Sequence, residues 1–312
     1  MNHEKITEHK RDYLAYLEVE RNVSPHTLRA YDSDLRQLLE FIERTAKNKK
    51  NDDVDLRETI QRFIVSLFYK KISKKSLSRK ITCMRSFAKF LRSVGIELKL
   101  DLQSPRMEKK LPEILTVDEI FFLLDKIKDT DVPSSFPCRD KAVLEMLYAT
   151  GVRCSELSAL KLFDIDFEEK TIRILGKGRR ERIALFGEKA KKRLLQYINS
   201  ERQQIVSQSE GTDSEDYGHV FLNCEGTQIT TRSIQRICTR FSQLLTSKKT
   251  ITPHKLRHSF ATHLLDQGVD LRVVQELLGH RAISSTEIYT QVSTTQLSEM
   301  CDKLHPLNKK SR

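Results

Sequence analysis

Apolar side chains recur at three- and four-residue spacing through the first hundred residues, and this constrains the region to amphipathic helices. Ser24 and Pro25 mark one helix start, because serine caps a helix and proline suits its first position. The apolar face of that helix comprises Leu28, Tyr31, Leu35, Leu38, Leu39 and Ile42. Other helices are expected over 6–19, 56–69 and 76–93, with a polar loop over 47–55.

The pattern changes after a charged stretch between two prolines, residues 104–112, which we interpret as an interdomain linker. Thr116 and Glu119 then have the spacing of a capping box. Strand-like segments over 171–175 and 182–185 flank a glycine- and arginine-rich turn, which predicts a hairpin or small sheet. Further helices are expected over 139–150 and near 188–204, 231–246, 254–267, 270–278 and 284–291, with a polar loop over 207–218.

These patterns predict a mainly α-helical protein with two domains, which is the number that 312 residues usually form. The N-terminal helical domain is expected over 1–103. The second domain, over 113–312, is expected to be α+β with a small β-sheet.

The net charge of +12 is high for a chain of this length and is unevenly distributed. Residues 1–110 contain 25 Lys and Arg against 16 Asp and Glu, and the segment from Ile60 to Ile96 contains ten basic residues and no acidic one. A solvated helix face or an acidic membrane surface could account for such a run. A single sign of charge along a helical pattern favours a surface that faces nucleic acid.

The cysteines indicate a reducing compartment. They stand at positions 83, 138, 154, 224, 238 and 301, with no CxxC spacing and no regular framework. The N-terminus is rich in charge and lacks the apolar core of a signal peptide. We therefore expect a cytoplasmic location.

The second domain contains a set of residue types that suits phosphodiester cleavage without a metal or another cofactor. The candidate residues are Arg153, Lys177, His254, Arg257, His280 and Tyr289. Arginine binds two phosphate oxygens through its planar fork and stays charged. Tyrosine supplies a nucleophile whose ionised form is favoured by nearby cations, and histidine and lysine can transfer protons.

Each of these residues also has an ordinary structural explanation. A tyrosine or histidine on an amphipathic helix usually packs or caps. The spacing argues for a joint role, because His254 and Arg257 lie three residues apart on one helix face and Gly279 ends the next helix before His280. His254, His258 and His263 raise the alternative of a zinc site, although the glutamate of an HExxH motif is missing.

The local sequences around these residues resemble the tyrosine recombinase (phage integrase) family, and most closely its XerC/XerD branch. The stretches that carry the resemblance are TGVRCSEL at 150–157, GKGRRER at 176–182, HKLRHSFATHLL at 254–265, LRVVQELLGH at 271–280 and STEIYT at 285–290. Two further matches, RNVSPHTLRAY at 21–31 and residues 76–87, lie in the N-terminal region. The resemblance therefore covers nearly the whole chain, and it implies a SAM-like N-terminal core-binding domain.

The resemblance implies a role for each candidate. Tyr289 would form a 3′-phosphotyrosyl bond, and Lys177 would protonate the departing 5′ oxygen. Arg153 and Arg257 would hold the scissile phosphate. His254 would take part in proton transfer with Tyr289, and His280 would hydrogen-bond the phosphate. Glu156 would orient the site or lie on the surface.

The same resemblance implies how the protein binds DNA and assembles. Two N-terminal helices would enter or border the major groove, and the expected DNA-binding residues are Lys75, Arg79, Lys80, Arg85, Arg232 and Gln235. Four protomers would assemble on a DNA recombination site, either alone or with a paralogous recombinase, and a septal DNA translocase would activate them. The tail, with Leu297, Met300 and Leu304 on one side, would dock on a neighbouring subunit or fold back on its own domain.

The resemblance points to a site-specific recombinase that resolves chromosome dimers at cell division. A transposon or phage integrase would use the same site but often carries an additional N-terminal domain. A DNA-binding regulator without catalysis is the alternative from another class, and the complete set of six residues argues against it.

Overall fold

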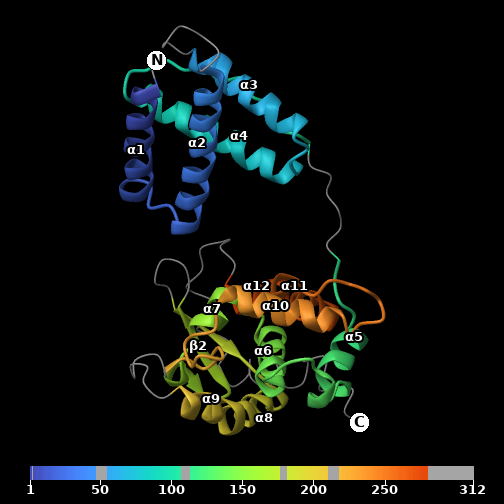
Figure 1. The fold of residues 1–312 in the computed structure, drawn as a ribbon. Coiled ribbons are helices and arrows are strands. Elements are labelled where there is room, and N and C mark those ends of the chain that lie inside the picture. The colour runs from blue at the N-terminus through green and yellow to red at the C-terminus, as the bar shows by residue number, and fades with distance from the viewer. Residues whose placement is uncertain (2, 47–54, 107–112, 176–180, 210–217, 280–312) are drawn as a thin grey trace. The chain divides into compact units, whose positions relative to one another are not determined.

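The computed structural model describes residues 1, 3–46, 55–106, 113–175, 181–209 and 218–279. The chain divides into two compact units, Met1–Leu111 and Pro112–Arg312, and each is described by itself (Figure 1). Within the described residues no helix is long and apolar enough to cross a membrane.

The first unit is a bundle of helices. Its elements are α1 (His3–Val19), α2 (Pro25–Ala46), α3 (Leu56–Tyr69) and α4 (Lys74–Ser93). The side chains of Asp55 and Ser73 cap α3 and α4 by accepting hydrogen bonds from the first-turn amides. The helices expected from apolar spacing are thus confirmed, with α1 beginning three residues and α4 two residues earlier than expected.

In the core of the first unit, α1 packs against the C-terminal half of α4. The ring of Tyr13 lies 5.3 Å from that of Phe87 and 5.5 Å from that of Phe90, measured between ring centres. All three side chains are buried. Aromatic pairs at this spacing add to the stability gained from area burial alone.

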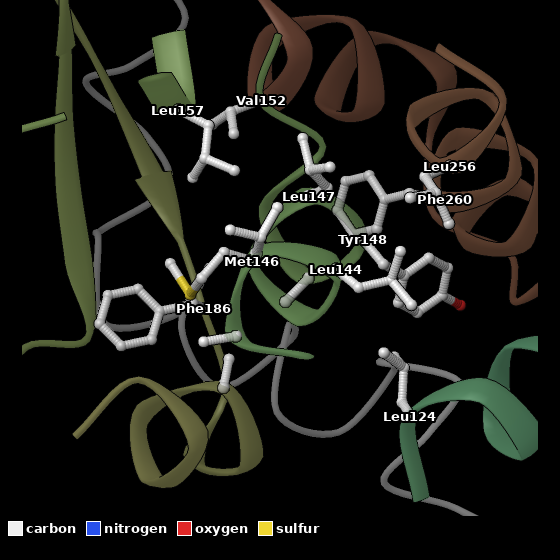
Figure 2. Packing of buried hydrophobic residues seen from close by; sticks show 14 of the residues in the cluster. Leu124, Leu144, Met146, Leu147, Tyr148, Val152, Leu157, Phe186, Leu256 and Phe260 are labelled. Carbon is white, nitrogen blue, oxygen red and sulfur yellow. The ribbon is translucent and has the colours of Figure 1, made fainter. Parts of the chain in front are cut away.

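The second unit surrounds a buried helix, α6 (Pro137–Thr150) (Figure 2). Every side chain of α6 from Asp140 to Thr150 is buried, so its sequence lacks a polar face. Leu144, Met146 and Leu147 pack into the core, with Phe186 beside Met146 and Leu256 and Phe260 near Tyr148. The helix therefore serves as the scaffold on which the other elements are placed.

The other helices of the second unit pack around α6 or follow it along the chain. In chain order they are α5 (Val117–Phe121), η1 (Phe122–Lys126), η2 (Asp129–Asp131), α7 (Cys154–Ala159), η3 (Leu162–Asp164), α8 (Glu188–Tyr197), η4 (Ile198–Arg202), α9 (Gln203–Gln208), α10 (Thr231–Ser242), α11 (Pro253–Asp266) and α12 (Leu271–Leu278). The capping box at Thr116 and Glu119 is confirmed at the start of α5.

A small antiparallel sheet completes the second unit. It has the order β1 (Ile165–Asp166), β2 (Thr171–Leu175) and β3 (Glu181–Leu185). In the pairing of β2 with β3, Thr171 lies opposite Leu185 and Leu175 opposite Glu181. The hairpin expected from the sequence is confirmed, and β1 adds a short strand that the sequence pattern did not indicate.

Two predicted helices differ from the structure. The helix expected over 188–204 is divided by the π-helical turn η4 and continues as α9, and the helix expected over 231–246 ends at Ser242. The helix expected over 284–291, the C-terminal tail and the centres of the predicted loops lie outside the described residues.

Candidate functional site

Arg153 is positioned by the turn between α6 and α7. Gly151 ends α6 in the left-handed conformation with φ of 58°, where a Cβ would lie 2.6 Å from the ring of Phe260. Arg153 then stands at the N-cap of α7, and its backbone N–H donates to Glu156 Oε2 over 2.8 Å. Its guanidinium donates to Glu156 Oε1, also over 2.8 Å, and remains 46% exposed. Glu156 thus holds the guanidinium of Arg153 on one side, and the exposed part of the guanidinium is accessible to a ligand.

Arg257 reaches the same place from α11. Thr252 caps this helix and Pro253 occupies its first position. The guanidinium of Arg257 is buried and donates to two backbone carbonyls, those of Gly151 and Leu278. Because Gly151 lies two residues before Arg153, these bonds fasten Arg257 to the turn that carries the other arginine.

The two arginines converge on the last residues of α12. Arg153 donates to the carbonyl of Gly279 over 3.4 Å, next to the Leu278 carbonyl that accepts from Arg257. Carbonyl groups at a helix C-terminus carry partial negative charge and favour cations. The structure therefore brings together two of the predicted site residues, from separate elements, beside the residue that precedes His280.

Arg182, on β3, is a third cation in this cluster, and sequence analysis assigned it no role. Its guanidinium donates to Glu156 Oε2 over 2.6 Å, and its side chain is only 12% exposed. Glu156, itself 7% exposed, is a ligand of both arginines rather than a surface glutamate. The sequence did contain a sign that Arg182 faces inward, because strand alternation places it on the same side as the buried Ala184.

The electrostatics of the cluster favour an anion. Burial lowers the pKa of Arg257 to about 10, and repulsion from Arg153 and Arg182 contributes, while Glu156 acts in the opposite direction. Arg257 nevertheless remains protonated at neutral pH. A bound phosphate would relieve this repulsion and could accept bidentate hydrogen bonds from an exposed guanidinium.

The histidines of α11 have different surroundings. His254 is exposed in the first turn, one turn before Arg257. His263 is buried, its Nδ1 lies 3.0 Å from the hydroxyl of Tyr148, and burial lowers its pKa. No group of three potential metal ligands gathers in the described part of the chain. His263 is thus a core residue, and the proposed zinc trio does not form among His254, His258 and His263.

Lys177, His280 and Tyr289 lie outside the described residues. Their expected roles stay predictions from the sequence. The described part of the site is the cluster of Arg153, Glu156, Arg182 and Arg257, with His254 nearby along α11.

The exposed face of α10 carries two of the expected DNA-binding residues. Arg232 and Gln235 line a shallow hollow together with Arg236, Thr239, Arg240 and Gln243. The opposite face of the helix is buried through Ile234, Ile237, Cys238 and Phe241. Arg240 is paired with the buried carboxylate of Asp140, so the other arginines of this face are the more available to a ligand.

Four of the expected DNA-binding residues lie on α4, and Lys80 differs from the other three in being buried. Lys75, Arg79 and Arg85 are exposed, whereas Lys80 is buried and donates to Asp34 Oδ1 over 2.7 Å and to Gln37 Oε1 over 2.9 Å. Arg79 also pairs with Asp34, and Arg85 bonds to the carbonyl of Leu102 and the hydroxyl of Ser104. The prediction that Lys80 lies on the DNA-binding surface was wrong because its partner, Asp34, lies on another helix.

Comparison with protein-family models assigns both units. Residues 113–296 match the phage integrase family, and residues 11–95 match the N-terminal SAM-like domain of phage integrases. Among curated relatives, the tyrosine recombinase XerC of Oceanobacillus iheyensis is 39% identical, with 94% of each chain covered. The tyrosine recombinase XerD of Staphylococcus haemolyticus is 37% identical, over 95% of this chain and 97% of that one.

Solved structures share the fold. A XerH site-specific recombinase bound to its difH substrate matches with a TM-score of 0.64 and 22% identity, over 93% of this chain and 83% of that one. A lambda integrase dimer bound to a COC′ core site matches with a TM-score of 0.62 and 16% identity, over 90% of this chain and 98% of that one.

The family matches of the two units define the class of protein, that of the phage integrases. The chain belongs to the phage integrase family and is a tyrosine recombinase, an enzyme that cleaves and rejoins DNA.

Proposed function

We propose that this protein recombines DNA at a specific site through Tyr289 and resolves chromosome dimers at cell division. The observation that carries the proposal is the convergence of Arg153 and Arg257 on the Leu278 and Gly279 carbonyls, directly before His280. Two fixed guanidinium groups form a site for one phosphate and for the charge that develops on its oxygens during cleavage.

The proposed reaction needs no metal, nucleotide or other cofactor. The Tyr289 oxygen attacks phosphorus, the bond from phosphorus to the 5′ oxygen breaks, and Lys177 gives that oxygen its proton. His254 accepts the proton of the tyrosine, and His280 donates a hydrogen bond to the phosphate. Because the phosphotyrosine conserves the energy of the phosphodiester, a 5′ hydroxyl from another strand can reverse the step and complete the exchange.

The exposed basic faces support duplex binding by both units. On α4, Lys75, Arg79 and Arg85 would contact backbone phosphates. On α10, Arg232 and Gln235 face solvent beside further polar side chains, as a helix that approaches a groove requires. Lys80 is omitted from this set because it is buried against Asp34.

We propose that the protein acts in the cytoplasm as part of a tetramer on DNA, together with a paralogous recombinase and under the control of a septal DNA translocase. The chain is similar to both kinds of Xer protein. The chain is 39% identical to the XerC and 36% identical to the XerD of Oceanobacillus iheyensis. The occurrence of both in one organism supports a paired system, and these nearly equal identities favour neither partner for this chain.

The central experiment uses a suicide substrate, a duplex that carries the recombination site with a nick beside the scissile phosphate. The wild-type protein is expected to form a covalent adduct that denaturing electrophoresis detects, and Tyr289→Phe is expected to form none. An adduct that persists in this variant would show that another residue is the nucleophile.

A second substrate tests Lys177. Lys177→Ala is expected to cleave the ordinary phosphodiester slowly but to regain speed when sulfur replaces the 5′ leaving oxygen, since a thiolate leaves without a proton. Equal impairment on both substrates would contradict the general-acid role.

A further inference from the structure

Arg182 occupies an unusual position for a charged side chain. It is the second residue of β3, opposite Ile174 of β2, and Ile174 is buried. Successive side chains of a strand point to opposite faces, so Arg182 shares a face with Ala184, which is also buried. Arginine is seldom placed on the buried face of a sheet unless it is paired, which indicates that its partner matters.

That partner is the carboxylate that holds Arg153. Glu156 Oε1 accepts from the guanidinium of Arg153 over 2.8 Å, while Oε2 accepts from the guanidinium of Arg182 over 2.6 Å and from the Arg153 backbone N–H over 2.8 Å. One buried carboxylate is therefore shared by two arginines. If Arg182 were removed, the whole charge of Glu156 would act on Arg153.

Arg182 also touches the other anchor of Arg153. Gly279 has φ of +64°, and a Cβ built on it would lie 2.6 Å from Nε and 2.7 Å from Cδ of Arg182. The carbonyl of this same glycine accepts from Arg153. The Arg182 side chain thus packs directly against the α12 terminus on which Arg153 and Arg257 converge.

Arg182 also contributes to the net positive charge of the cluster, which matters for catalysis. Arg153, Arg182 and Arg257 together with Glu156 carry two net positive charges, and loss of Arg182 would leave one. The influence of Arg182 extends to Arg257, whose pKa it helps to lower. In the transition state of phosphoryl transfer, the non-bridging oxygens carry more negative charge than in the substrate, so fixed positive charge accelerates the reaction.

We propose that Arg182 is a positioning residue of the cleavage site, which shares Glu156 with Arg153, keeps Arg153 and Arg257 oriented toward the scissile phosphate and adds its own positive charge to the cluster. This inference rests on the proposed phosphate-binding role of those two arginines. Arg182 acts through Glu156 and Gly279 and is not proposed to touch the DNA.

The test compares Arg182→Met and Arg182→Lys with the matched variant Arg173→Met, which lies on the neighbouring strand β2 and is 54% exposed. Full-length proteins are assayed for adduct formation on two suicide substrates. One has an ordinary scissile phosphate. The other has a methylphosphonate there, in which a methyl group replaces one charged non-bridging oxygen.

Arg182→Met is expected to cleave the phosphodiester about 10- to 100-fold more slowly than the wild type. This is below the roughly 10²- to 10³-fold cost of losing a donor in direct contact with the developing charge, because Arg182 acts through Arg153. The deficit should shrink to within about threefold on the methylphosphonate, because less charge then needs stabilisation. Arg182→Lys should be intermediate, since it retains the charge without the fork. Arg173→Met should match the wild type on both substrates.

A merely structural Arg182 would give a different pattern, with the same deficit on both substrates, and that result would overturn the proposal. Wild-type rates for Arg182→Met would also overturn it, while leaving the proposed function intact. If the methionine variant does not fold, Arg182→Lys decides by the same comparison of substrates. A wild-type protein that forms no adduct would refute the proposed function and this inference together.

Discussion

Lys80 Nζ and Asp34 Oδ1 lie 2.7 Å apart within the N-terminal unit, and both side chains are buried. Lys80 comes from α4 and Asp34 from α2, so this pair fastens the helix with the basic outer face to the rest of the bundle. Arg79, which also pairs with Asp34, extends the connection toward the surface. A residue of the basic run thereby acts in folding rather than in binding.

Lys80→Met is therefore expected to destabilise the protein, by about 3 kcal/mol, because the buried Asp34 carboxylate then keeps the partly exposed Arg79 as its cation but loses its buried partner. Urea unfolding of the full chain, followed by circular dichroism, measures the loss. Lys75→Met is the matched control, since Lys75 is exposed on the same helix. Equal stability of the two variants would contradict the structural role of Lys80.

Lys75→Met should instead weaken DNA binding. A lysine that contacts one phosphate contributes about one unit to the slope of log affinity against log salt concentration. The slope for the variant is expected to be shallower by about that amount, as measured by fluorescence anisotropy with a duplex over a range of salt concentrations. An unchanged slope would remove Lys75 from the DNA interface.

Two arginines on the same face of α10, Arg232 and Arg240, are expected to differ in function. Arg232→Gln should lower DNA affinity with little change in stability, because Arg232 is exposed. Arg240→Gln should mainly lower stability, because Arg139 is then the remaining cation that pairs with the buried carboxylate of Asp140 among the described residues. The same anisotropy and urea measurements separate the two effects, and a stability loss in Arg232→Gln would contradict the assignment.

The features that could be predicted from the sequence are local. Apolar spacing and caps located the helices, because both signals lie within one turn of the residues that they concern. Gly279 was expected to end the helix before His280 for the same reason, and it does so with positive φ. Arg153 and Arg257 were recognised through short motifs whose residues lie close together along the chain.

The features that sequence reasoning missed depend on contacts between distant segments. Asp34 meets Lys80 across 46 residues, and Glu156 meets Arg182 across 26. Periodicity places Lys80 on the apolar face of α4 and Arg182 on the same side of β3 as Ala184, but it does not reveal the distant carboxylate with which either residue pairs. The strand β1 was missed because two residues are too few to show alternation.

Glu145 gives the second unit a stability that depends on pH. Burial raises its pKa to about 7 and Asp125 contributes, while Arg193, Lys189 and Lys141 act in the opposite direction. Between the ordinary value of 4.5 and about 7 the folded chain holds a proton on Glu145 that the unfolded chain has lost. This group therefore makes the folded state less stable as pH rises through that window, and contributes no further change above it.

Glu145→Gln removes this titration. The stability of the variant relative to the wild type is expected to rise by up to about 3 kcal/mol from the acid to the neutral end of the window, at about 1.4 kcal/mol per pH unit. Urea unfolding at a series of pH values checks this. The control Glu188→Gln removes an exposed carboxylate at the start of α8, and the response of Glu145→Gln is compared with it. A flat difference for Glu145→Gln would mean that this carboxyl does not control the pH response.

Gly279 and Gly268 are a matched pair of positions with which the packing of Arg182 at the site can be tested. Both have positive φ, +64° and +85°, so alanine strains the backbone at either position by about 1–2 kcal/mol. A Cβ at Gly268 meets nothing within 4 Å, whereas a Cβ at Gly279 meets the Arg182 side chain. Both variants should lose similar stability, but only Gly279→Ala should displace Arg182 and slow adduct formation on the suicide substrate, by about tenfold or more. Comparable cleavage by the two variants would show that the α12 terminus tolerates movement of Arg182, and that its packing there is not needed for the reaction.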